Sequence, residues 1–172
     1  MDYEFFMHKA LKEAGQALAA GEFPVGCVIV YDNEVVVTGS RHHSTPECYN
    51  ELDHAEMLAL RRLVKTGSNI VRKKAYVFTT LEPCLMCYSA LIINDIRTIV
   101  YAYEDVLGGG TDVDLKVLKP FYTAINAEII PGILRQESIK LFKTFFSNPN
   151  NNYLKETALA KHVRNALGPE NL

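Results

Sequence analysis

The spacing of the apolar residues changes repeatedly along this chain, and that alternation limits the folds it can adopt. Helical spacing of three and four residues alternates with short runs rich in β-branched residues. The helical pattern predicts helices at residues 3–20, 54–66, 84–93, 133–146 and 152–166, and a short one at 113–118 that Pro120 stops. The apolar runs predict strands at residues 25–31, 34–39, 75–79, 97–102 and 127–130. Strands alternating with helices predict an α/β fold: a three-layer α/β/α arrangement around a five-stranded mixed sheet.

Size and charge exclude several classes of protein. The chain has 172 residues, 48% of them hydrophobic and 22% charged, which fits one globular domain and not a disordered or fibrous chain. Its formal net charge is −2, so overall charge does not attract nucleic acid. No apolar run reaches the ~18 residues of a membrane span, and the acidic N-terminus is unlike a secretory signal. We therefore expect a cytoplasmic protein that makes no contact with membranes.

Two short motifs, each at the start of a predicted helix, contain metal-binding side chains. Cys84 and Cys87 are three residues apart, so both sulfurs lie on one helix face, and the helix dipole favours their thiolate form. His54 adds an imidazole at the start of another helix. Two thiolates and one imidazole suit Zn²⁺, and three protein ligands leave the fourth position open for water.

Glu56 follows His54 by two residues, and in such a site it would transfer protons and not bind the metal. Zinc lowers the pKa of a bound water towards ~7, so that hydroxide forms at neutral pH. A carboxylate beside that water can take its proton and later pass it to a leaving group. The residues therefore predict hydrolytic attack on an electrophilic carbon, with Glu56 as the proton shuttle.

Other interpretations of these motifs are simpler. Asp53 and Glu56 have the spacing of a capping box, and the Cys84–Cys87 pair is also compatible with two core residues or a redox pair. A non-catalytic zinc domain would need a fourth ligand, for which the candidates are Cys27, His42, His43 and Cys48. The joint occurrence of His-x-Glu and Pro-Cys-x-x-Cys favours the catalytic interpretation, because together they are a known signature of zinc nucleobase deaminases.

With these motifs the chain resembles the cytidine deaminase superfamily, and within it bacterial tRNA adenosine deaminases. The resemblance extends over roughly residues 3–146, and its matching segments are 23–28, 80–87, 103–105, 131–137 and 145–146. It implies a zinc-dependent deaminase domain over residues 1–146, with residues 147–172 as a helical extension of the same domain. It also implies one zinc ion per chain held by His54, Cys84 and Cys87, with Glu56 as the catalytic residue. A homodimer is expected, as is common in the family.

The resemblance also implies a substrate pocket. Candidate substrate-binding residues are Val25, Arg41, Ala55, Leu81, Glu82, Asp105 and Phe146. Val25 and Leu81 are equally compatible with the core, and Phe146 with an apolar helix face. Arg41 would contact a phosphate or a purine edge, or would be a solvated loop residue, which is the simpler interpretation.

Three segments depart from the pattern of tRNA deaminases. Arg41 or His42 stands where those enzymes usually have a base-contacting Asn, and residues 50–53 read Asn-Glu-Leu-Asp in place of Asp-Pro-Thr-x. The segment 147–172 carries three basic and two acidic residues, where tRNA deaminases often end in a basic helix. A tRNA adenosine is therefore the leading substrate, and the alternatives are a free base, nucleoside or nucleotide (guanine, cytosine, cytidine or deoxycytidylate).

Overall fold

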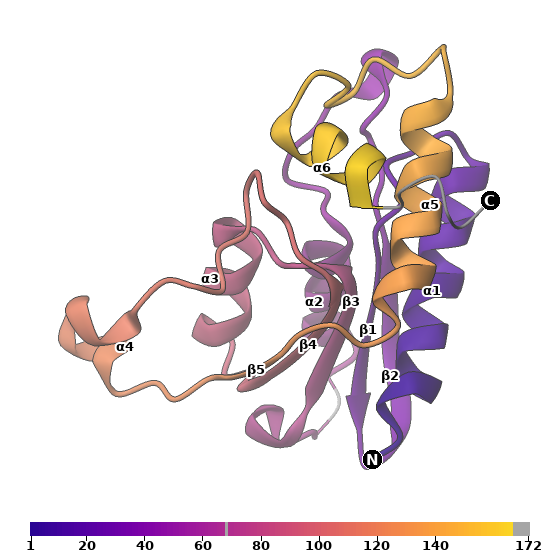
Figure 1. The fold of residues 1–172 in the computed structure, drawn as a ribbon. Coiled ribbons are helices and arrows are strands. Elements are labelled where there is room, and N and C mark those ends of the chain that lie inside the picture. Colours follow the sequence, from indigo (N-terminus) through magenta and orange to yellow (C-terminus); the bar gives the residue numbers. More distant parts are fainter. Residues whose placement is uncertain (68, 167–172) are drawn as a thin grey trace.

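The fold is built on one mixed sheet, seen in a computed structural model that describes residues 1–67 and 69–166 (Figure 1). Its strands are β1 (Gly26–Tyr31), β2 (Glu34–Ser40), β3 (Tyr76–Leu81), β4 (Thr98–Tyr103) and β5 (Glu128–Ile130). Their order is β2-β1-β3-β4-β5. Strand β1 is antiparallel to β2 and β3, whereas β3, β4 and β5 are parallel. The turn between β1 and β2 places Asp32 and Asn33 at positive φ, as a tight hairpin requires.

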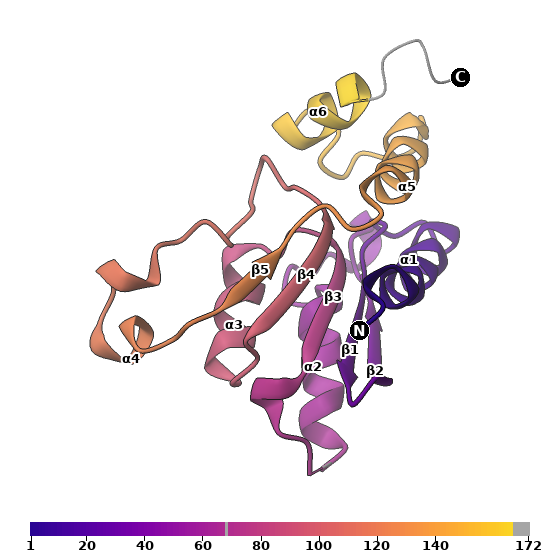
Figure 2. The same cartoon turned by 60° about the horizontal axis from the view of Figure 1, so that its bottom comes forward.

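Helices cover both faces of the sheet, which confirms the predicted three-layer arrangement (Figures 1 and 2). The helices are α1 (Tyr3–Ala19), α2 (Ala55–Lys65), α3 (Leu85–Ile93), α4 (Pro120–Thr123), α5 (Arg135–Ser147) and α6 (Ala158–Ala166). Helices α1 and α5 pack on one face and α2 and α3 on the other. Residues 104–127, which include α4, extend from the body as an arm beside α3 (Figure 1).

Two predicted helices are shorter in the structure. The helix expected at 152–166 begins only at Ala158, because the Asn151 side chain accepts a hydrogen bond from the Tyr153 amide and Leu154 adopts a positive φ. The helix expected at 113–118 is a single 3₁₀ turn, Leu115–Val117, capped by Asp114. Pro120 begins α4, since proline suits the first position of a helix.

The segment before and within α6 packs on the body of the fold. Leu159, Ala160 and Val163 are fully buried and belong to the same hydrophobic core as the sheet and α5. This packing places α6 above the carboxyl end of the sheet (Figure 1). In the described residues we find no helix with the length and apolar character to cross a membrane.

Candidate active site

The start of α2 holds two of the predicted functional side chains. His54 is the residue that precedes the first turn, and no side chain caps this helix end. The capping-box interpretation of Asp53 and Glu56 is therefore wrong. The Glu56 side chain instead points into the fold, where it accepts a hydrogen bond of 2.7 Å from the Thr79 hydroxyl of β3.

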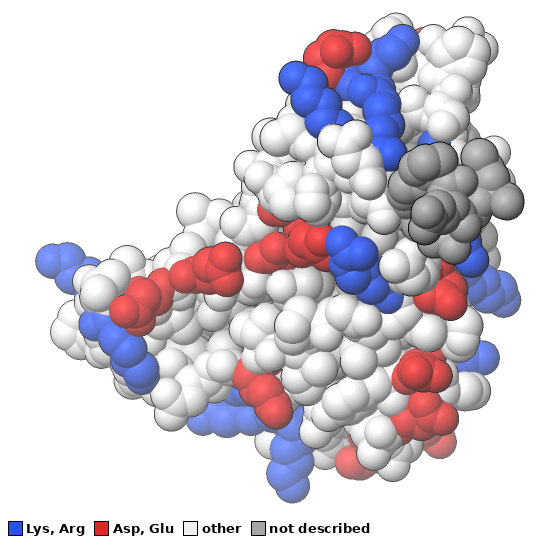
Figure 3. Space-filling model, viewed as in Figure 1, with Lys and Arg blue, Asp and Glu red and all other residues white. Residues whose placement is uncertain are grey.

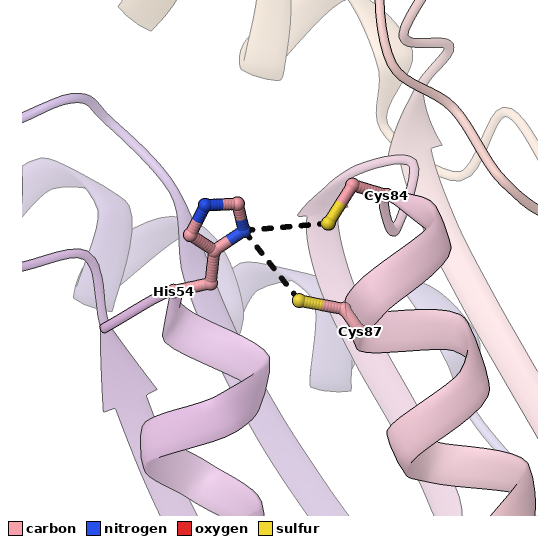
Figure 4. Close-up of side chains that lie close together, drawn as sticks. All are labelled: His54, Cys84 and Cys87. Carbon is pink, nitrogen blue, oxygen red and sulfur yellow. Dashed lines mark hydrogen bonds between the residues drawn. The ribbon is translucent and has the colours of Figure 1, made fainter. Parts of the chain in front are cut away.

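The start of α3 brings both predicted cysteines to His54 (Figure 4). Cys84 precedes the first turn of α3 and Cys87 lies one turn later. The His54 Nδ1 atom lies 3.5 Å from each of the two sulfurs. The three donor atoms are all within 4.8 Å of one another, so one metal ion can contact all of them. This donor set fits zinc in its chemistry.

Other cysteines and histidines lie outside this cluster. In the described part of the chain, His54, Cys84 and Cys87 form the one group of three or more metal-binding side chains. Cys27 is buried within β1, whereas Cys48 is exposed. No fourth ligand joins the cluster from Cys27, His42, His43 or Cys48, so the structure lends no support to a closed four-ligand site.

Of the three side chains in this cluster, Cys84 is in the charge state that a metal ligand needs. The hydrogen bond from Cys87 and the proximity of His54 lower the pKa of Cys84 to about 4. Burial lowers the pKa of His54, but the Cys84 hydrogen bond and the charge of Glu56 outweigh it and raise that pKa to about 8. Cys87, by contrast, keeps its proton because its hydrogen bond to Cys84 and its burial raise its pKa well above the usual value. In the metal-free protein the cluster is thus a thiolate and an imidazolium beside a neutral thiol.

Glu56 lies against the cysteine side of this cluster, while Glu51 contacts the Nε2 atom of His54. The Glu56 Oε2 atom lies 3.6 Å from the Cys87 sulfur, and the Glu56 side chain is almost completely buried. Burial raises its pKa, because a carboxylate loses hydration when it leaves water. A carboxyl group with a raised pKa is suited to accepting and returning a proton.

A pocket opens directly above the cluster. Most of the residues predicted to bind substrate line it, together with His54, Glu56 and Cys84: Val25, Arg41, Ala55, Leu81, Glu82 and Asp105. Phe146 does not line it. Its ring is buried behind the pocket against Phe23, so the structure places it in the core.

Two of the pocket residues, Glu82 and Arg41, form hydrogen bonds with other groups of the protein. The Glu82 carboxylate accepts hydrogen bonds from the Asp105 amide at 3.1 Å and from the Thr111 hydroxyl at 2.5 Å, which fixes the loop after β4. Arg41 is 2% exposed, so the interpretation as a solvated loop residue is wrong. Its guanidinium donates to the Asn50 carbonyl at 2.9 Å and to Glu51 at 3.0 Å.

The sequence did not indicate four further pocket residues: Phe23, Tyr153, Leu154 and Leu159. Two of them, Tyr153 and Leu154, come from the segment that leads into α6, and Leu159 lies in its first turn. Leu159 packs on the body of the fold while also facing the pocket. No local pattern distinguishes a side chain that packs on the core from one that also borders a pocket.

Comparisons with known proteins agree with this geometry. The family described as the cytidine and deoxycytidylate deaminase zinc-binding region matches residues 1–103. A tRNA-specific adenosine deaminase from Streptococcus pyogenes is 30% identical over 159 residues, which cover 92% of this chain and 90% of that protein. The tRNA-specific adenosine deaminase 2 of Xenopus tropicalis is 35% identical over 155 residues, covering 86% of this chain and 90% of that protein.

The fold comparison gives the same group of proteins. A solved structure from a study of A-to-I editing by tRNA:A34 deaminases at the wobble position of transfer RNA has a TM-score of 0.67 and 29% identity. The match covers 80% of this chain and 98% of that one.

Proposed function

Because this chain belongs to the cytidine and deoxycytidylate deaminase family and is a hydrolytic deaminase, we propose that its substrate is an adenosine in tRNA. The relatives named tRNA-specific adenosine deaminase match nearly the whole chain, which supports this substrate over others. The reaction replaces the exocyclic amine of the base by oxygen from water and releases ammonia.

We assign one zinc ion per chain to His54, Cys84 and Cys87. Their three donor atoms lie within 4.8 Å of one another, His54 and Cys84 line the pocket, and the family has a zinc-binding region. A bound zinc ion supplies Lewis-acid chemistry that makes water nucleophilic at neutral pH. Cys84 is already deprotonated at that pH, which favours metal entry.

The proton transfers fall to Glu56. Its carboxylate takes a proton from the attacking water and delivers it to the ring nitrogen next to the carbon under attack. It then carries the second proton of that water to the amine, so that the C–N bond breaks and ammonia leaves. The observation that supports this role most strongly is the burial of Glu56 between Thr79 and the metal-binding cluster, facing the pocket.

The walls of the pocket suit a flat base. We propose that Val25, Ala55 and Leu81 contact its faces and edges, and that Asp105 borders the open side. Arg41 and Glu82 lie in the same wall, but their hydrogen bonds to protein groups point to a supporting role. We do not retain Phe146 as a contact, since it lies in the core.

RNA binding requires basic groups near the pocket, because phosphate contacts supply much of the affinity. Lys161 and Arg164 are exposed on α6, next to the segment that lines the pocket. Figure 3 shows Lys and Arg side chains, with an acidic group among them, over this upper part of the face, and both acidic and basic side chains on the arm. We propose that the phosphates of an RNA stem-loop lie along α6.

A second candidate substrate is a free base or nucleoside. It is favoured by one observation: Tyr153, Leu154 and Leu159 border the pocket from above. A small molecule would have to enter only the pocket beneath these side chains, whereas an RNA loop would also need a path past them. In either case we expect a cytoplasmic enzyme, where tRNA and free nucleobases both occur.

Ammonia release by the zinc-loaded protein distinguishes these substrates. The panel consists of an anticodon stem-loop with a wobble adenosine, guanine, cytosine, adenosine, cytidine and deoxycytidylate. We expect release from the stem-loop. Release from a small molecule alone would overturn the tRNA assignment, and release from none would overturn the deaminase mechanism for these substrates.

Glu56→Gln tests the catalytic assignment. The amide has the size of the carboxyl group but cannot carry the proton, so turnover should fall by about 10²–10⁴-fold, while zinc content stays near one per chain. Glu47→Gln is the matched control, because Glu47 lies in the exposed turn Pro46–Cys48, outside the residues that line the pocket. Undiminished turnover in Glu56→Gln would contradict the assignment.

A further inference from the structure

The three segments in which this chain departs from tRNA deaminases meet at one point in the structure. Arg41 follows β2, Glu51 lies in the loop before His54, and Tyr153 precedes α6. Arg41 Nη2 donates to Glu51 at 3.0 Å, and the Tyr153 hydroxyl lies 3.1 Å and 3.2 Å from the two oxygens of Glu51. Residues that are 10 and 102 positions apart in sequence thus form one connected cluster.

Arg41 gives this cluster its fixed charge. Its side chain is buried, and its guanidinium donates to the Asn50 carbonyl, to Glu51 and, at 3.4 Å, to the Tyr153 hydroxyl. A buried guanidinium without a counter-charge is costly, so the position of Glu51 is set by Arg41. Although Glu51 is 45% exposed, two donors from other segments hold its carboxylate in place.

The other contact of Glu51 is with a metal-binding residue. Its Oε2 atom lies 3.2 Å from the Nε2 atom of His54, on the opposite side of the ring from the two cysteine sulfurs. A metal at Nδ1 leaves the imidazole proton on Nε2, where it is donated to Glu51. A carboxylate at this position fixes the ring and makes it a more basic ligand.

We propose that Glu51 is the positioning residue for His54, and that Arg41 and Tyr153 hold it in place. This inference rests on the zinc site assigned above. It gives the segment before α6 a role besides closing the pocket: its Tyr153 hydroxyl reaches the metal centre through one carboxylate. Zinc affinity then depends on the Tyr153 hydroxyl as well as on Glu51.

Zinc affinity tests the proposal directly. It is measured on the full chain by competition with a chromophoric chelator, together with the visible spectrum of the Co²⁺-loaded protein. Glu51→Gln keeps the size of the side chain and removes the charge, so we expect zinc affinity to fall by about 10–100-fold and the Co²⁺ spectrum to change. Tyr153→Phe removes only the hydroxyl and should give a smaller loss in the same direction.

The matched control is Glu47→Gln, which removes a carboxylate from the same loop outside the metal-binding group and should leave zinc affinity unchanged. Thermal unfolding of the metal-free variants checks that the fold is intact. Wild-type zinc affinity and Co²⁺ spectrum in Glu51→Gln would overturn the proposal. If that variant does not fold, Tyr153→Phe decides, and wild-type affinity there overturns it equally.

These measurements use no substrate, so they are separate from the test of function. A wild-type protein that binds zinc but releases no ammonia from the panel would contradict the proposed function alone. A Glu51→Gln variant with normal zinc affinity in a protein that edits the stem-loop would contradict the present proposal alone.

Discussion

At the residue scale, the protonation of three side chains determines how a metal enters the site. The cluster needs a neutral imidazole nitrogen and two thiolates to bind zinc. Near pH 7 Cys84 has already lost its proton, whereas His54 and Cys87 have not, given a pKa of about 4 for Cys84, of about 8 for His54 and well above the usual value for Cys87. Zinc therefore displaces two protons at this pH.

We predict that zinc affinity rises steeply with pH and that the slope decreases near pH 8. Between pH 6 and 8 two protons leave on binding, which corresponds to roughly a 100-fold gain in affinity per pH unit. Above pH 8 the imidazole of His54 is already neutral, and only the Cys87 proton remains to be displaced. Calorimetry in buffers of different ionisation enthalpy counts these protons.

Cys48→Ser serves as the control for this count, because Cys48 is exposed and lies outside the cluster. It should release the same number of protons as the wild type. A single proton released at pH 7 would contradict the predicted charge state.

Residue type and spacing were enough to predict which side chains come together at the metal site, but not to predict Arg41. Histidine and cysteine are the usual ligands of zinc. His54, Cys84 and Cys87 all lie at the starts of helices that the apolar spacing predicts. Arginine is a common residue in surface loops. The burial of Arg41 depends on Glu51 and Tyr153, which lie 10 and 112 residues away. Such a partnership is created by the tertiary fold, so no local pattern reveals it.

At the scale of elements, the site depends on how closely α2 approaches β2. Gly39 of β2 faces the first turn of α2, where a Cβ atom would overlap the Ala55 carbonyl and lie 2.8 Å from the Ala59 amide nitrogen. The absence of a side chain therefore lets the helix start, with His54 and Glu56, lie directly on the sheet.

We predict that Gly39→Ala destabilises the protein and weakens the metal site. The added methyl group must displace α2, and overpacking of this kind costs about 1–3 kcal/mol. Zinc affinity should fall as well, because His54 precedes the displaced turn. Chemical denaturation and chelator competition measure the two effects.

Gly15→Ala is the control for this substitution. Gly15 lies within α1 and has open space where its Cβ would be. Alanine is favoured there by about 0.5–1 kcal/mol, so this variant should be more stable than the wild type. Equal effects of the two substitutions would show that close approach at Gly39 is not the cause.

The boundaries of helices and strands were predictable where the apolar periodicity extends over many residues. They were less predictable where side-chain hydrogen bonds turn the backbone. The five strands and the helices that cover them agree with the pattern. The start of α6 does not, because Asn151 and the positive φ of Leu154 form turns before the helix. Asparagine favours such turns through hydrogen bonds to nearby backbone amides, a competition that apolar spacing does not register.

At the scale of the whole molecule, several large apolar side chains remain exposed on α2, α3 and the arm. Val64 of α2 and Ile93 of α3 are about half exposed, and these two helices pack against each other on the same face of the sheet (Figure 2). Val117 and Phe121 are exposed on the arm, Val117 to 77%. Clustered exposed apolar side chains are typical of surfaces that bind another protein. A second copy of this chain is the partner that we expect.

We predict a homodimer in which this α2–α3 surface is buried. Light scattering after gel filtration should give about twice the 19.3 kDa mass of the chain. Ile93→Glu places a charge in the expected interface and should shift the protein towards the monomer, because an unpaired buried charge is unfavourable. Phe5→Glu is the matched control: Phe5 is equally exposed but lies on α1, on the opposite face of the sheet, and its substitution should leave the dimer intact. A wild-type monomer at assay concentrations would contradict the prediction, and dissociation by Phe5→Glu alone would move the interface to the α1 face.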